Sequence, residues 1–103
     1  MADPMRVRAI EQGGMTEVKV LMRHDMETGL RKDAAGKLVA AHFIQHFSVR
    51  HKDKDVFSAQ LGPAISKDPF IGFKFKGGVK GDKIVVTWVD NLGEKRLDEV
   101  VIA

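Results

Sequence analysis

Hydrophobic and polar residues alternate along most of this chain, which is the pattern of half-buried β-strands and not of helices. In "IVVTWVD", for example, Ile84, Val86 and Trp88 share one parity, and Trp88 is expected in the core. Strands are predicted in seven segments: residues 6–10, 17–23, 41–51, 56–61, 70–76, 84–90 and 95–103.

Turn-forming residues separate these segments. Gly13-Gly14, Asp53–Asp55 and Asp90–Glu94 are predicted turns, and "GPAISKDP" (Gly62–Pro69), with its two prolines, is a predicted loop that crosses between sheets. Short strands with close turns and no amphipathic helix indicate an all-β fold, an immunoglobulin-like antiparallel β-sandwich of about seven strands. Residues 1–103 form a single domain on this interpretation.

Two of the predicted strands are apolar on both parities. Val85 and Val89 lie on the parity opposite to Trp88, and Ile44 lies opposite to Phe43 and Phe47. A sheet with one solvated face carries polar residues on that face. We therefore expect the second face to be covered by another chain, with Ile44, Val85 and Val89 as candidate contacts.

Composition excludes several classes of function. The 103 residues are 44% hydrophobic and 30% charged with a net charge of +3, and acids are interleaved with bases, so we expect a solvated surface and no nucleic-acid partner. The absence of cysteine excludes disulfides and thiolate chemistry. "MADPMRVRAIEQ" has no apolar segment, so no signal peptide and no membrane association are expected, and these facts alone favour the cytoplasm.

The loop "HDMETGLRKDAAGK" contains the residues that are best suited to catalysis or metal binding. His24 could pair with Asp25 or Glu27 for acid–base work, but no nucleophile motif accompanies them. His42 and His46 lie four apart on a predicted strand, hence about 13 Å apart, too far to share a metal ion. We expect no catalytic residue, no metal and no cofactor.

Three stretches resemble the SoxZ family. "HDMETGLRKDAAGKLV" is similar to that family's His-x-Met-Glu-Ser/Thr-Gly-x-Arg-x-Asp loop with its following glycine turn. "VFSAQLGPAISKDPFIGFKF" resembles its Phe-x-Ala-x-Leu-x-Pro-x-Ile-Ser-x-Asn-Pro-aromatic stretch, with Asp68 at the position where the family more often has asparagine. "TWVDNLGE" is similar to the C-terminal hairpin of the family.

The resemblance implies a non-catalytic subunit of the SoxYZ carrier complex of thiosulfate and reduced-sulfur oxidation, with an immunoglobulin-like fold. Its partner in the heterodimer is SoxY, whose C-terminal cysteine carries the sulfur intermediates, and other Sox enzymes make transient contact with the complex. The resemblance also implies the periplasm, because a SoxZ chain without a signal peptide is exported with a signal-bearing SoxY.

The same loop is the candidate surface for this partner, through His24, Met26, Glu27 and Arg31. Arg31 offers a planar fork to a carboxylate or to carbonyls, and Met26 offers an adaptable apolar contact. Alternatively, Glu27 and Arg31 pair with each other and brace the loop. Docking and bracing are equally compatible with the sequence.

Two other functions remain open. A periplasmic, copper-chaperone-like metal-binding module would use His24 and Met26 with His42 or His46. A small hydrolase would use His24 and Asp25, but it would lack a nucleophile.

Overall fold

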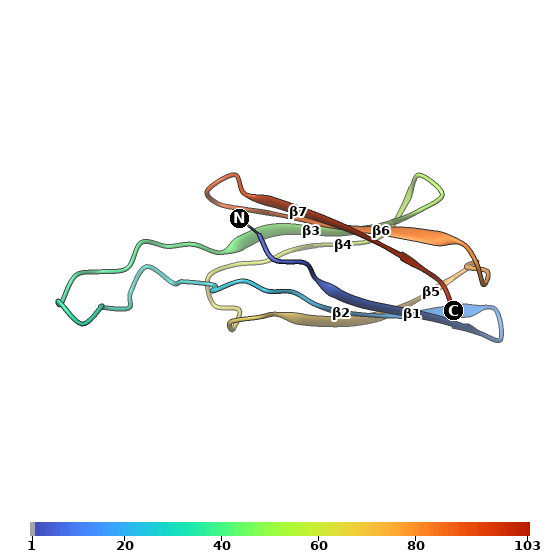
Figure 1. The fold of residues 1–103 in the computed structure, drawn as a ribbon, viewed down its shortest axis with the longest axis horizontal. Coiled ribbons are helices and arrows are strands. Elements are labelled where there is room, and N and C mark those ends of the chain that lie inside the picture. Colours follow the sequence, from blue (N-terminus) through green and yellow to red (C-terminus); the bar gives the residue numbers. More distant parts are fainter. Residues whose placement is uncertain (1) are drawn as a thin grey trace.

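A computed structural model describes residues 2–103 as a sandwich of two antiparallel sheets, with no helix among these residues (Figure 1). This confirms the predicted fold class. The strands are β1 (Arg6–Gln12), β2 (Met15–Leu21), β3 (Ile44–His51), β4 (Lys54–Gln60), β5 (Phe70–Lys76), β6 (Lys83–Asp90) and β7 (Lys95–Val101).

One sheet has three strands in the order β1-β2-β5, and the other has four in the order β4-β3-β6-β7. The loop Gly62–Pro69 carries the chain from β4 in the larger sheet to β5 in the smaller one, as predicted. At one side of the sandwich the C-terminal residue joins the two layers, because Ala103 N–H donates to Ala9 O and Glu11 N–H donates to Ala103 O.

The core lies between the sheets and follows the predicted parity in β2, β5 and β6. Trp88 is 1% exposed, and Val18, Val20 and Val86 are fully buried. Each such aliphatic side chain contributes about 1.5–3 kcal/mol by leaving water. The alternation of hydrophobic and polar residues along these strands therefore determines which face of each sheet turns inward.

The orientation predicted for Ile44 is wrong. It was expected to face away from Phe47, yet both side chains are fully buried. The pairing of β3 with β6 shifts between Ile44 and His46, where an irregularity of the β-bulge type interrupts the alternation. Ile44 therefore points into the core.

Two hairpins use two-residue turns with left-handed backbone. Gly13 and Gly14 have φ of 62° and 84°, a conformation that glycine adopts without cost. Lys52 and Asp53 have φ of 52° and 61°, so the β3–β4 turn lies one residue before the predicted Asp53–Asp55 and forms without glycine.

Between β2 and β3 the chain leaves the sandwich, runs outward and returns, which makes the molecule 53 × 20 × 19 Å (Figure 1). We call residues 24–42 the arm. Its two legs are joined by bridges from Glu27 to His42 and from Lys32 to Leu38. Among residues 2–103 no helix has the length and apolar character needed to span a bilayer.

Candidate partner-binding site

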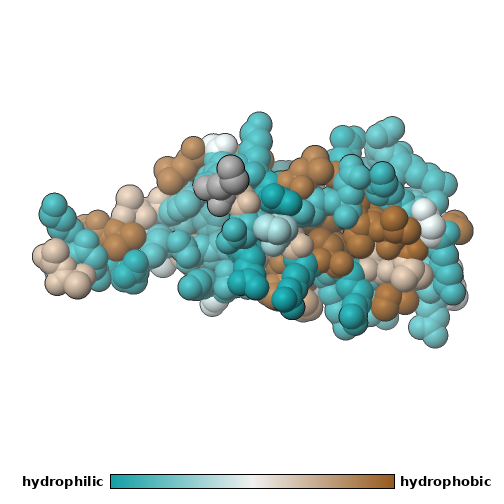
Figure 2. Space-filling view, viewed as in Figure 1, coloured by the Kyte–Doolittle hydropathy of each residue, from teal (hydrophilic) through white to brown (hydrophobic). Residues whose placement is uncertain are grey.

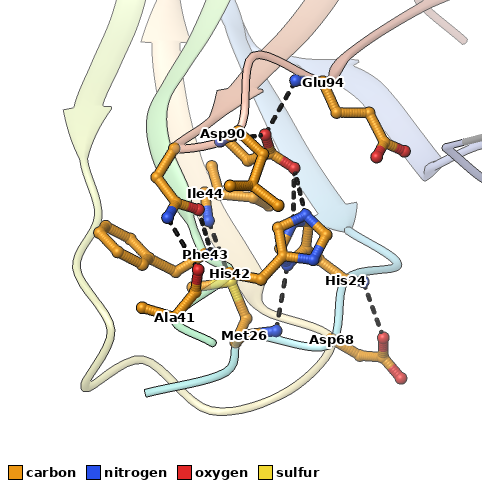
Figure 3. A network of polar contacts seen from close by, with 11 residues as sticks. His24, Met26, Ala41, His42, Phe43, Ile44, Asp68, Asp90 and Glu94 are labelled. Atoms are coloured by element: carbon orange, nitrogen blue, oxygen red, sulfur yellow. Dashed lines mark hydrogen bonds and ion pairs between the residues drawn. The ribbon is translucent and has the colours of Figure 1, made fainter. Parts of the chain in front are cut away.

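The base of the arm is held by one carboxylate at the end of β6. Asp90 Oδ2 accepts hydrogen bonds from His24 Nε2 at 3.0 Å and from His42 Nε2 at 2.7 Å (Figure 3). Its Oδ1 accepts from the backbone N–H groups of Leu92 at 3.0 Å and Glu94 at 2.9 Å. A single side chain thus ties both legs of the arm to the β6–β7 turn.

Asp90 is ionised in this environment although its side chain is fully buried. Burial raises the pKa of a carboxyl group, but here the hydrogen bonds from His24 and His42 and from the two turn amides outweigh it and hold the pKa of Asp90 below its usual value.

Two further side chains complete the base of the arm. Asn91 Oδ1 accepts from Phe43 N–H and its Nδ2 donates to Ala41 O, so Asn91 holds the returning leg in place. Asp68, in the loop between the sheets, exchanges bonds with the outgoing leg: its Oδ1 accepts from His24 N–H and its own N–H donates to His24 O. We call His24, His42, Asp68, Asp90 and Asn91 the root cluster.

The hydrogen bonds of the root cluster determine which nitrogen of His24 carries the proton. Met26 N–H donates to His24 Nδ1 at 3.0 Å, so Nδ1 has a free lone pair and the ring proton sits on Nε2, where it is donated to Asp90. A metal ion bound at Nε2 would force that proton onto Nδ1, against the Met26 N–H.

His24, His42 and Asp90 are a group whose spacing invites comparison with a metal site, with one ligand atom from each within 4.8 Å of the others. Ligands about 2.0 Å from a tetrahedral zinc lie about 3.3 Å apart, whereas the two histidine nitrogens lie 3.0 and 2.7 Å from the carboxylate oxygen. Met26 Sδ already accepts from Ile44 N–H. The geometry favours hydrogen bonds from His24 and His42 to Asp90, which we call the clasp, over coordination of a metal ion.

The arm beyond the root cluster is ordered by its own polar contacts and exposes leucines. Arg31 donates to Glu27 through Nε at 3.0 Å and Nη2 at 2.7 Å, and this pairing lowers the pKa of Glu27. Asp33 Oδ1 accepts from two backbone amides of the tip. Leu30 is 81% exposed and Leu38 is 63% exposed, and Figure 2 shows hydrophobic residues among hydrophilic ones on this projection.

The outward face of the four-stranded sheet carries an apolar strip. Val85, Thr87 and Val89 of β6 are half-buried there, and Leu97, which pairs with Thr87, is 54% exposed. Polar residues of β3, among them Ser48, flank this strip. The second face is thus apolar along β6 and mixed on either side of it.

The predicted contact residues fall into two groups. Glu27 and Arg31 lie on the arm, and Val85 and Val89 lie on the outward sheet face. In contrast His24, Met26 and Ile44 are buried and present almost no surface.

Sequence reasoning missed the clasp and the exposed leucines. The pairing expected for His24 was with Asp25 or Glu27, yet its partner Asp90 is 66 positions away, a separation that no local pattern can indicate. Leu30, Leu38 and Leu97 were missed because one isolated leucine in a polar stretch carries no period. His46 lies on the outward face of β3, away from His24 and His42.

Comparison with known proteins decides the family. The model of the family described as "Sulphur oxidation protein SoxZ" matches residues 5–101, nearly the whole chain. The chain belongs to the SoxZ family. It is therefore a protein of sulfur oxidation, and the sequence resemblance is confirmed.

A solved structure of another kind of protein has a similar fold. The crystal structure of a superoxide reductase in the oxidised state superposes on this SoxZ-family chain with a TM-score of 0.67 at 15% identity, covering 99% of this chain and 89% of the other. At that identity the likeness concerns the fold alone. None of the curated proteins compared with the chain matches it.

Proposed function

We propose that this chain is the non-catalytic subunit of a SoxYZ carrier complex, which binds SoxY and holds it while the SoxY cysteine carries sulfur intermediates. The family match over residues 5–101 carries the proposal. A cysteine-free sequence is compatible with it, since such a subunit cannot compete for the sulfur bound to its partner.

The arm supports a binding role. An isolated two-stranded hairpin is only marginally stable in water, yet this one is fixed at its base by the root cluster and presents two leucines to solvent. Exposed apolar side chains on a preorganised element bury apolar area when a partner binds, and little conformational entropy is lost because the element is already ordered. We infer that Leu30 and Leu38 contact SoxY, with the strip around Val85, Val89 and Leu97 as a second contact surface.

In this mechanism the subunit is a rigid body. The flexible segment of SoxY moves between enzymes while the paired sandwiches keep the rest of the carrier folded, which lowers the cost of each docking event. Export of the pair to the periplasm on the signal peptide of SoxY belongs to the same proposal, and fractionation of cells with and without SoxY checks it.

Co-purification with SoxY tests the proposal. The chain should elute with SoxY as one species in size-exclusion chromatography, and the double variant Leu30→Asp/Leu38→Asp should weaken the complex about tenfold or more, because charge replaces buried apolar surface. Ala34→Asp, at the exposed tip of the same arm, is the matched control and should bind as the wild type does. A chain that stays monomeric beside SoxY contradicts the proposal.

The alternatives are tested on the same material. Titration with Cu(I) or Zn(II), followed by His24→Ala, would reveal a metal-binding module through stoichiometric binding that the substitution removes. Turnover of thiosulfate by the chain without SoxY would reveal an enzyme. We expect neither result.

A further inference from the structure

The outward face of the three-stranded sheet gathers basic residues that lie far apart in sequence. The register of β1, β2 and β5 places alternate residues of the three strands on one surface. These are Arg6, Arg8, Ile10 and Gln12 of β1, then Met15, Glu17, Lys19 and Leu21 of β2, and Phe70, Gly72, Lys74 and Lys76 of β5. We call this surface the basic face.

The charge of the basic face is largely uncompensated. Of the ionisable residues at these outward positions, only Glu17 is acidic, and its carboxylate lies 4.0 Å from Lys19 Nζ. The remaining bases (Arg6, Arg8, Lys74 and Lys76) form no ion pair within residues 2–103.

One pair on this face is unfavourable for the isolated fold. Arg8 and Lys19 are direct cross-strand partners, and like charges directly opposite each other destabilise a sheet. A sheet retains such a pair at a cost to its own stability, which is expected where an external anion offsets the repulsion. The pair therefore points to a ligand.

A shallow hollow of about 570 Å³ opens beside this pair, lined by Arg6, Arg8, Lys19, Leu21 and Phe70 together with Met5 and Val7. Phe70 is 62% exposed, and its ring lies over Gly72, where a Cβ would stand 3.7 Å from Phe70 Cε2. The hollow thus offers three cations and an apolar wall, which suits carboxylates that flank an apolar side chain.

We propose that the basic face is a docking surface for an acidic protein surface, namely that of an enzyme that acts on the SoxY cysteine. This inference rests on the proposed function, because the carrier must meet such enzymes in turn. Three strands of seven residues cover only a few hundred Å² by strand geometry, well below the roughly 800 Å² per partner of a stable complex. Contacts of that size and charge are short-lived and electrostatically steered.

Two other anionic partners fit the basic face less well. Platforms for single-stranded nucleic acid stack bases on several aromatic rings, and Phe70 is the single aromatic residue among the outward positions of β1, β2 and β5. A membrane surface would not need the hollow. Binding of nucleic acid and of lipid vesicles is therefore measured in the experiment below.

Arg8→Glu, made in the SoxYZ complex, is the decisive variant. It replaces repulsion from Lys19 by attraction, so the melting temperature should rise by about 1–4 °C, and misfolding cannot explain a loss of docking. With the complex as substrate for each purified Sox enzyme, kcat/KM should fall about tenfold at low ionic strength for at least one of them, through KM. At about 0.5 M salt, where the Debye length is about 4 Å, the difference should shrink to within twofold.

Lys80→Glu is the matched control, since it changes the net charge equally from the exposed turn between β5 and β6, outside both proposed contact surfaces. The proposal is overturned if Arg8→Glu leaves every enzyme unaffected, or if Lys80→Glu has the same effect. It is also overturned if a 20-nucleotide single-stranded DNA or phosphatidylglycerol vesicles bind the wild-type complex and not Arg8→Glu.

Loss of SoxY binding in Arg8→Glu would show that the basic face is the surface that binds SoxY. That result rejects this inference and leaves the proposed function intact. Failure of the wild-type chain to bind SoxY rejects the proposed function, and the inference falls with it.

Discussion

The two sheets present outward faces of opposite character. On the four-stranded sheet two ion pairs lie within the face: Lys83 Nζ lies 3.1 Å from Glu99, and Arg50 Nε lies 3.2 Å from Asp55. On the three-stranded sheet the basic face carries charges with almost no internal partner.

This difference separates two kinds of contact. A face with paired charges and an apolar strip suits a lasting contact, because burying it leaves few ions unpaired. A face with unpaired cations around a small hollow suits brief encounters, because its attraction acts over a distance and depends on salt.

The largest effect is expected at the anchor of the four-stranded sheet. Asp90→Asn removes a buried acceptor from His24 and His42, and its amide group confronts their N–H donors, so the free energy of unfolding should fall by about 3 kcal/mol. Because the pKa of Asp90 is depressed in the folded state, its contribution is present above about pH 4 and is lost as the pH falls through the folded-state value.

Urea unfolding at pH 3 and pH 7 measures both effects of this substitution. The wild type should lose more stability on acidification than Asp90→Asn does. Equal losses in the two proteins would show that Asp90 does not carry the acid sensitivity.

A charge in the apolar strip comes next. Leu97→Asp should weaken SoxY binding about tenfold to a hundredfold, because the carboxylate would be buried against apolar surface. Phe70→Asp, an equivalent change on the basic face, should leave SoxY affinity within twofold. Calorimetric titration of SoxY into each variant compares them, and a reversed order would exchange the roles of the two faces.

Salt should distinguish the two kinds of contact without any substitution. Raising the salt concentration from about 0.05 to 0.5 M should change SoxY affinity less than threefold, whereas the association rate with a Sox enzyme should fall about tenfold. Stopped-flow association measures the second quantity. Equal salt dependence of both contacts would contradict the division.

The smallest effect is expected from an ion pair of the four-stranded sheet. Lys83 and Glu99 are both largely solvent-exposed, so Glu99→Gln should cost no more than about 0.5 kcal/mol of stability. Thermal unfolding against wild type checks this. A loss several times larger would mean that the paired charges stabilise this face beyond ordinary surface pairs.

Local signals were enough for much of the architecture. Alternation placed Val18, Val20 and Trp88 in the core, and the glycines at 13 and 14 marked a turn that the backbone makes with positive φ. Where local regularity broke, prediction failed: the irregularity between Ile44 and His46 reversed the face of Ile44. Alternation cannot reveal such a break, because the residue types around it do not mark which residue is left out of the pairing.

The structure bears differently on the docking and the bracing interpretations of the arm. The pair that Glu27 makes with Arg31, at 2.7 Å, shows the bracing, while docking remains part of the proposal. The sequence suggested this pair because its members lie four residues apart. It gave no sign that Asp90 would hold both histidines.

The strand pattern, the lack of cysteine and the family motifs can be read from the amino-acid order alone, because they depend on residue type and on neighbours a few positions away. The folded arrangement was needed to see that Asp90 holds His24 and His42 of the arm and that bases from β1 and β2 share one face with those of β5. The physical reason is that strand order and register bring distant residues together, and both are fixed by how the whole core packs.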